Sequence, residues 1–226
     1  MLKKNNLILN EVNIIKAIKF SGIKKGSSVF LTTSLGMFGL NKNKNLNQLF
    51  LKCIKKIIGP KGNIFVPTYS YSFSDKRLKI FDLDNTKSKI GSFPNFILKH
   101  KNFIRSEDPF MSVAGNGPLV KKIFKNLPKT SHGKDCLFAR LLNIKNMKNV
   151  SLGVGPYWLP FNHHLDWVNK VEYRYDKLFR GYLKVKDKKK LINWVYSVHP
   201  YQHQALASSK KVCDMALKKK IIKFEP

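Results

Sequence analysis

An amphipathic helix between two short apolar segments is the feature that most restricts how this chain can fold. Over residues 46–58 the apolar side chains recur every three or four positions, and Gly59 and Pro60 end the pattern. The apolar runs 29–31 and 64–66 lie on either side and are predicted to be short buried strands. Alternation of strands and helices is typical of α/β proteins with a largely parallel sheet.

The rest of the chain continues this alternation. A third short strand is predicted at 150–152. Three further helices and one long surface loop are predicted, the helices over 9–22, 93–103 and 117–127 and the loop over 68–92. No internal repeat, linker or break in composition divides the sequence. We therefore expect one domain over residues 1–226, with a mixed, largely parallel central sheet flanked by helices.

Composition is typical of a globular protein. Hydrophobic residues make up 43% of the 226 residues, which is enough apolar surface to offset the entropy lost on folding. No apolar run approaches the ~20 residues that cross a bilayer, and no long apolar region follows the basic residues near the N-terminus. The cysteines at positions 53, 136 and 213 are far apart, which favours separate buried thiols over disulfides or a zinc site. A cytoplasmic protein is expected.

The net charge is strongly positive, because 43 Lys and Arg residues oppose 13 Asp and Glu residues and give +30. Such a charge suggests nucleic-acid binding. Only five of the 43 are arginines, however, and arginine is the residue whose planar fork recognises bases and phosphates. The lysines are spread along the whole chain, which favours a lysine-covered surface that attracts anionic ligands. A non-catalytic module that binds nucleic acid or acidic surfaces is the alternative.

Small and polar residues follow the first predicted strand, at the place where α/β folds bind ligands. This turn consists of Thr32, Thr33, Ser34, Leu35 and Gly36. Its hydroxyls and backbone N–H groups could hold a phosphate or polarise a carbonyl. A capped turn without a ligand would have the same sequence.

Residues 162–166, Asn-His-His-Leu-Asp, form the densest group of chemically active side chains. If Asn162 caps a helix, His163 and Asp166 lie three positions apart on one helical face. A carboxylate beside an imidazole fixes its tautomer and stabilises the ring after proton uptake, as in a general base with its orienting group. An exposed polar pair or a buried structural histidine is the alternative. A metal site is disfavoured, because the neighbouring His163 and His164 point to different helical faces.

Seven segments, each weak alone, follow one another in an order that is hard to obtain by chance. They are residues 22–35, 59–70, 81–91, 105–113, 133–137, 152–155 and 163–174. In these segments, from about residue 15 to about residue 222, the chain resembles the aminoglycoside 3-N-acetyltransferase family.

The resemblance implies a single α/β domain that transfers the acetyl group of acetyl-CoA to an amine on a sugar ring, without a metal. It places His163 where the family has its catalytic histidine and Asp166 where the family usually has Glu. The turn over residues 32–36 would face the thioester and pantetheine, and its backbone N–H groups would stabilise the oxyanion. Near the CoA phosphates or pantetheine would lie Arg105, Ser106 and Ser112.

The chain also departs from the family. The motif Arg-Ser-x-His-Pro has Asp108 in place of His, and the chain ends at Pro226, where many members continue. A site for a polycationic aminoglycoside needs several carboxylates, which are scarce in a chain with 13 acids and 43 bases. We therefore expect a nucleotide- or lipid-linked amino sugar of surface-glycan assembly as acceptor, in contact with Tyr69 and Asp108. An aminoglycoside, and with it antibiotic resistance, is the alternative.

The expected partners are thus a CoA thioester and an amino-sugar acceptor. A homodimer is compatible with the sequence. Specific binding to nucleic acid and insertion into a membrane are not expected, because the lysines form no concentrated patch and no apolar run is long enough.

Overall fold

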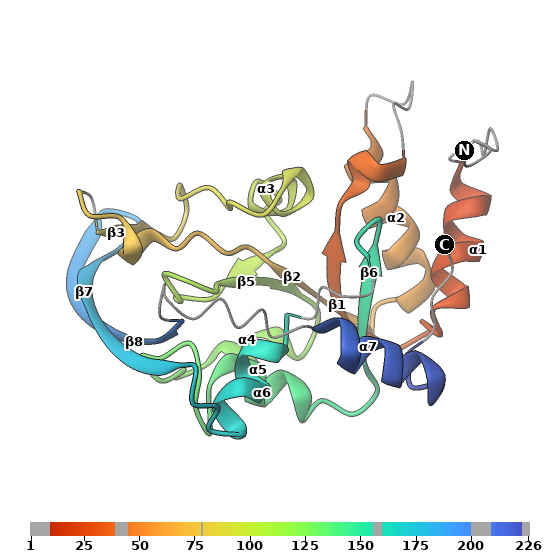
Figure 1. Ribbon diagram of the computed structural model, residues 1–226. Helices are drawn as coiled ribbons and strands as arrows, with labels where there is room; N and C mark the ends of the chain where they lie inside the picture. The colour runs from red at the N-terminus through yellow and green to blue at the C-terminus, as the bar shows by residue number, and fades with distance from the viewer. Residues whose placement is uncertain (1–9, 39–44, 78, 156–159, 200–208, 223–226) are drawn as a thin grey trace.

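The computed structural model describes residues 10–38, 45–77, 79–155, 160–199 and 209–222. Its main sheet has five strands in the order β4-β5-β2-β1-β6 (Figure 1). The strand bounds are β1 Ser28–Thr33, β2 Asn63–Pro67, β4 Ile104–Arg105, β5 Val113–Asn116 and β6 Met147–Leu152. β1 is parallel to both β2 and β6, whereas β5 is antiparallel to both β2 and β4. The predicted mixed sheet of an α/β protein is confirmed, but two of its four strand pairs are antiparallel, so it is not largely parallel as expected.

Helices cover both faces of this sheet, and each face has its own hydrophobic core. Val29 and Leu31 of β1 point into a core made with α1 (Glu11–Phe20), α2 (Leu46–Ile58) and α3 (Ser92–Leu98). Phe30, between them, points into a second core made with α4 (Val120–Phe124) and α5 (Leu137–Leu142). Because both faces are covered, β1 and β2 are buried along their whole length rather than at alternate positions.

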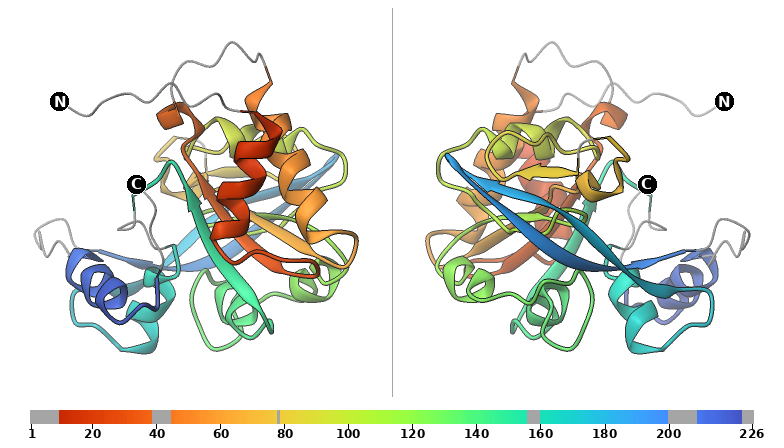
Figure 2. Two further views of the ribbon diagram at one scale, coloured as in Figure 1. Left: turned by 90° about the vertical axis from the view of Figure 1, so that its right-hand side faces the viewer. Right: turned by 90° about the vertical axis from the view of Figure 1, so that its left-hand side faces the viewer.

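A second, three-stranded sheet lies at the end of the molecule opposite α1 and α2 (Figure 1). β7 (Tyr175–Val185) and β8 (Lys188–Val198) form a long antiparallel hairpin, and β3 (Ile80–Asp82) is parallel to β7. Figure 2 shows the hairpin as a long curved ribbon. Its inward side chains, such as Ile192 and Trp194, complete the second core. α6 (Asn162–Val168) precedes the hairpin, and α7 (Ser209–Lys218) follows it.

The central elements lie where the sequence predicts them. The predicted strands at 29–31, 64–66 and 150–152 fall within β1, β2 and β6, and the helix over 46–58 coincides with α2. The cysteines are buried thiols, and no disulfide joins them in the described parts of the chain. Within these same ranges, no helix is long and apolar enough to cross a membrane.

Three expectations about the periphery are wrong. Residues 68–92 are not a surface loop, because Tyr69, Phe73 and Phe81 are buried, and the segment contains β3 and a short 3₁₀ helix, η2 (Ser72–Ser74). The hairpin, which the sequence analysis did not predict, supplies the cover that buries these aromatic rings. The helix predicted over 93–103 ends already at Leu98, as α3. The helix predicted over 117–127 spans only Val120–Phe124, as α4.

Candidate active site

His163 and Asp166 lie on α6, which begins the segment leading into the hairpin. Asn162 is the first residue of this helix and does not cap it. The preceding residue, Phe161, stands at the cap position and has no side-chain hydrogen bond there. Phe161 instead packs against Phe30 of β1, with ring centroids 4.9 Å apart. The start of α6 is therefore fixed by aromatic packing on the central sheet rather than by a polar cap.

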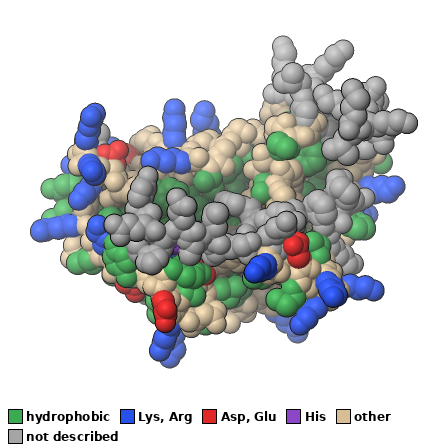
Figure 3. Space-filling view, viewed as in Figure 1, with side chains coloured by type: hydrophobic (Ala, Val, Ile, Leu, Met, Phe, Trp, Pro, Cys, Tyr) green, Lys and Arg blue, Asp and Glu red, His purple; other side chains and the backbone are tan. Residues whose placement is uncertain are grey.

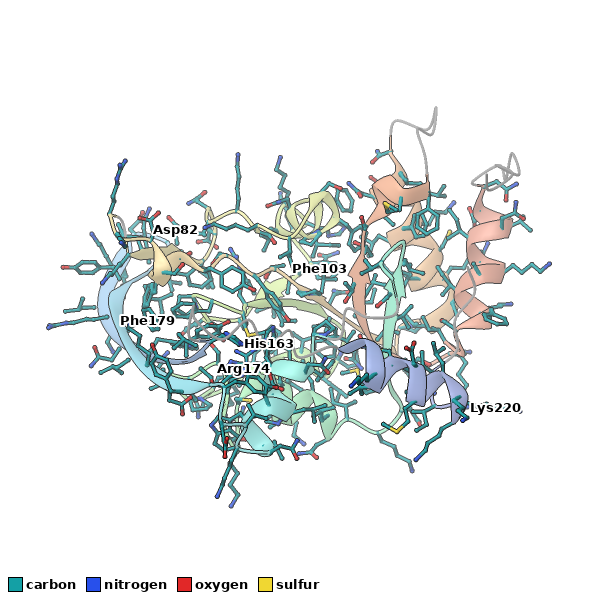
Figure 4. The ribbon with its side chains drawn as sticks, in the orientation of Figure 1. Asp82, Phe103, His163, Arg174, Phe179 and Lys220 are labelled. Carbon is teal, nitrogen blue, oxygen red and sulfur yellow. The ribbon has the colours of Figure 1, made fainter. Side chains whose placement is uncertain are left out.

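Arg174 lies between Asp166 and His163. Its Nη2 is 2.8 Å from His163 Nδ1, and its Nε donates to Asp166 Oδ2 at 2.7 Å. Figure 4 shows His163 and Arg174 close together. The Tyr173 hydroxyl donates to Asp166 Oδ1 at 2.8 Å, and Arg174 Nη1 donates to the carbonyl oxygen of Ser197. The direct Asp166–His163 contact expected from their spacing is thus corrected, because the guanidinium occupies the space between the two side chains.

The guanidinium also determines the hydrogen-bonding roles of the His163 ring. A guanidinium can only donate, so His163 Nδ1 must accept and the proton of the neutral ring is on Nε2. Burial lowers the pKa of His163 to about 4, with a further lowering by the charge of Arg174 and a partial offset by Asp166. His163 is therefore neutral near pH 7.

A second imidazole, His132, stands beside His163 and was not found from the sequence. The two ring centroids are 6.3 Å apart, and the His132 centroid is 5.4 Å from that of Tyr196 on β8. Burial lowers the pKa of His132 to about 3, helped by the charges of His163 and Arg174. The only sequence signal was its position directly before the segment 133–137 that matches the family.

The two residues expected to bind the acceptor are both buried near these histidines. Asp108 Oδ1 accepts from the backbone N–H groups of Phe110 and Met111 at 2.8 and 2.9 Å. Burial raises the pKa of Asp108 to about 6, against these hydrogen bonds and one from Ser131. The Tyr69 hydroxyl is buried and has no hydrogen-bond partner among the described residues. Burial raises its pKa most, and the neighbouring Tyr71, Asp108 and Tyr196 raise it further. These groups form one buried polar cluster.

The turn after β1 forms the wall of a pocket of about 220 Å³. All five residues of the predicted turn line it, together with Ile90, Gly91, Ser92 and Val154. The hydroxyls of Thr32 and Thr33 are buried and have no hydrogen-bond partner among the described residues. Two unsatisfied hydroxyls beside a pocket are suited to a ligand that brings hydrogen-bonding groups, as the amides of pantetheine would.

The expected CoA contacts of Arg105, Ser106 and Ser112 are not supported, because these side chains are buried and bonded within the fold. Arg105 donates to Ser112 Oγ and to the carbonyl oxygens of Leu83, Thr86 and Thr68. Ser106 Oγ accepts from the backbone N–H of Val113, and Ser112 Oγ donates to the carbonyl oxygen of Thr68. The Arg105 guanidinium also lies over the Phe81 ring, 4.7 Å from its centroid. Arg105 thus ties the segment after β2 to the loop after β3.

His164 points away from His163, as adjacent residues on a helix do. It is buried, and its Nδ1 is 3.4 Å from the Cys136 sulfur at the start of α5. In the described parts of the chain, no three His, Cys, Asp or Glu side chains are grouped so that they could hold a metal ion.

The sequence matches the model of the aminoglycoside 3-N-acetyltransferase family over residues 30–220. The chain belongs to this family. It is accordingly an acyltransferase that moves the acetyl group of acetyl-CoA to an amine. A comparison with curated proteins found no match.

Solved structures of similar fold accompany the family match. Aminoglycoside acetyltransferase AAC(3)-Xa has a TM-score of 0.78 and 15% identity, over 94% of this chain and 82% of that one. AAC-IIIb, solved as a binary complex with CoASH, has a TM-score of 0.76 and 13% identity, over 93% and 85%. The YokD protein from Bacillus subtilis has a TM-score of 0.73 and 15% identity, over 91% and 87%. At these identities the likeness shows that the acetyltransferase shares their fold.

Proposed function

We propose that this acetyltransferase acetylates the amine of an amino sugar and that a buried histidine of the site around Arg174 carries the proton. An amine attacks a thioester only as the neutral form and must lose a proton as the bond forms, which a neutral imidazole can accept. The observation that carries the proposal is His163, which is buried, neutral near pH 7 and held in one orientation by Arg174. Asp166 acts through Arg174, as its positioning residue.

On the donor side, we infer that the pocket at the end of β1 receives the thioester and pantetheine arm of acetyl-CoA. Thr32 and Thr33 supply hydroxyls that lack partners, and the turn over residues 33–35 supplies backbone N–H groups for the developing oxyanion. Acetyl-CoA is charged and is made inside cells, so we place the reaction in the cytoplasm.

On the acceptor side, we favour an anionic, nucleotide- or lipid-linked amino sugar. The acids that could have formed a pocket for a polycation are already engaged. Asp82 pairs with Lys184, Glu107 with Lys129 and Asp166 with Arg174. Asp108, in turn, accepts hydrogen bonds from backbone N–H groups.

An aminoglycoside is the second candidate acceptor. It is favoured by the family description and by the likeness to AAC-VIa, a structure of which has sisomicin bound. An anionic acceptor would instead be drawn by the lysines, which Figure 3 shows dispersed around the face in view.

Release of free CoA from acetyl-CoA, measured across a panel of acceptors, tests this proposal. The panel contains nucleotide-linked amino sugars, simple amino sugars and aminoglycosides. We expect release with the nucleotide-linked sugars above all others. Release with none of the amines would contradict amino-sugar acetylation, and release with aminoglycosides alone would assign the acceptor to that class.

A further inference from the structure

His132 is a buried imidazole without a hydrogen-bond partner among the described residues. The residue is 3% exposed, and neither ring nitrogen is bonded to another group in the part of the chain that the structure describes. Nearly all buried polar groups in proteins are satisfied, so an exception needs an explanation. A histidine kept in this state beside His163 is typical of a group whose partner arrives with the substrate.

The loop that carries His132 is held against β8 by hydrogen bonds at the preceding residue, Ser131. The Ser131 backbone N–H donates to the Val195 carbonyl oxygen at 3.1 Å, and Trp194 Nε1 donates to Ser131 Oγ at 2.9 Å. The His132 backbone N–H donates to Thr130 Oγ1 at 3.2 Å. β8 and Thr130 therefore fix the position of the imidazole, as expected of a preorganised site.

The two imidazoles present different hydrogen-bonding groups. The only lone pair of His163 is on Nδ1, which accepts from Arg174, so Nε2 offers a donor. His132 has one lone pair and one N–H, and neither is in use. The ring centroids are 6.3 Å apart, so the two rings are close enough to contact different atoms of one bound substrate.

We propose that His132 is a second catalytic histidine, which accepts the proton of the reacting amine while His163 donates a hydrogen bond from Nε2 to the acetyl oxygen. This inference rests on the proposed amine acetylation and identifies which imidazole takes the proton. His163 could serve as the acceptor only if Arg174 left Nδ1, whereas His132 needs no rearrangement of the resting hydrogen bonds.

The step balances with these two residues. The amine lone pair forms the N–C bond to the thioester carbon, and the C=O π pair moves to the oxygen, which accepts from His163 Nε2–H. The extra proton on nitrogen goes to His132. When the oxygen re-forms the carbonyl, the C–S bond breaks, and His132 returns the proton to the CoA thiolate to give CoASH and the amide.

The variant His132→Leu tests the proposal, because it removes the lone pair and leaves an apolar side chain of similar size. We expect kcat to fall at least about 10²-fold and acetyl-CoA affinity to change less than about twofold. We also expect the melting temperature not to fall, since an unsatisfied buried polar group is removed. His164→Leu is the matched control, because His164 is also buried but contacts Cys136. It should keep its turnover.

His132→Gln decides the question if the leucine variant fails to fold. Its amide keeps polarity and similar length but is not a base, so turnover should still be lost. Normal turnover in either folded variant would overturn the proposal. The proposal would also be overturned if His132→Leu lost turnover together with a lower melting temperature and His132→Gln had normal turnover.

His163→Ala separates this inference from the proposed function. If His163→Ala loses turnover and the His132 variants do not, only the role of His132 is overturned. If His163→Ala also keeps turnover, the proposed histidine chemistry at this site fails as a whole.

Discussion

Arg174 does for His163 what a carboxylate does in a simple carboxylate–imidazole pair, but with the opposite charge. A carboxylate would raise the pKa of the ring, whereas Arg174 lowers it and fixes the proton on Nε2. The carboxylate of Asp166 does not contact His163 directly; it accepts hydrogen bonds from Arg174 and Tyr173. This arrangement keeps the imidazole neutral without leaving the guanidinium unpaired.

Substitutions at His163 and Asp166 should differ in severity. His163→Ala should lower kcat at least about 10²-fold, because it removes the ring that contacts the reacting group. Asp166→Asn should cost less, because its effect on His163 passes through Arg174. Steady-state CoA release measures both. Asp135→Asn is the control, since Asp135 also pairs with an arginine, Arg140, but on the exposed surface. An Asp166→Asn loss equal to that of His163→Ala would contradict the indirect role.

Stability should fall on acidification because two histidines are neutral in the fold. The pKa values of His132 and His163 are about 3 and about 4 against 6.5 ordinarily, so the unfolded chain takes up these protons first as pH falls below 6.5. Asp108 works in the other direction between about pH 6 and 4, because burial raises its pKa from 3.8 to about 6. Two histidines outweigh one carboxyl, so the free energy of unfolding decreases between pH 6 and 4.

Removing His132 should make this loss shallower. In His132→Leu the slope of unfolding free energy against pH should decrease by up to about 1.4 kcal/mol per pH unit, the value for one proton. Urea unfolding between about pH 7 and pH 5 measures it, a window in which His132 stays neutral in the fold. An unchanged slope would show that His132 binds its proton equally well in the folded and unfolded protein, which contradicts a lowered pKa.

The turn after β1 depends on a close approach by the end of β6. Gly153 has φ +67, and a Cβ there would collide with the carbonyl oxygen of Ser34. Gly153→Ala should therefore displace the turn, lower stability by about 1–3 kcal/mol and weaken acetyl-CoA binding. Gly155→Ala is the control, since a Cβ there meets no described atom within 4 Å. Denaturant unfolding and calorimetric titration with acetyl-CoA measure the two effects; equal behaviour of both variants would contradict the role of the turn.

Elements whose pattern is local were predictable from the sequence. α2 has a clear helical period, and short apolar runs mark β1 and β2 on either side of it. From these three elements the centre of the sheet and the turn at its edge could be predicted. The β7–β8 hairpin was missed because its exposed positions mix charged residues with apolar and aromatic ones, so the two strands show no clear alternation.

The acid–base centre was only half predictable. His163 belongs to a recognisable cluster, but His132 is 31 residues away along the chain and reaches it only through the pairing of its loop with β8. The role expected for Arg105 stays a prediction. The family resemblance implies a position near the CoA phosphates or pantetheine, yet backbone carbonyls from two other segments, after β2 and after β3, bind its guanidinium. A single-domain chain remains a prediction.

At the scale of the whole molecule, the net charge of +30 should influence which acceptors arrive. A nucleotide-linked amino sugar is attracted and a polycationic aminoglycoside is repelled, and salt screens both effects. We expect kcat/KM to be higher for the nucleotide-linked sugar, with an advantage that shrinks from low to physiological salt. A monocationic amino sugar is the control, with a weaker salt dependence. Faster acetylation of the aminoglycoside at both salt concentrations would refute the argument from charge.

The donor pocket and the histidine group come from different parts of the chain, so a nascent protein acquires their residues in a fixed order. The pocket assigned to acetyl-CoA is lined by residues between Thr32 and Val154, whereas Arg174 and His132 are held by carbonyls and side chains of β8, as far as Ser197. Because proteins leave the ribosome N-terminus first, the segments that line the donor pocket are exposed before β8 has been made. A chain arrested before β8 would therefore contain every pocket residue but lack the strand that holds Arg174 and the loop of His132.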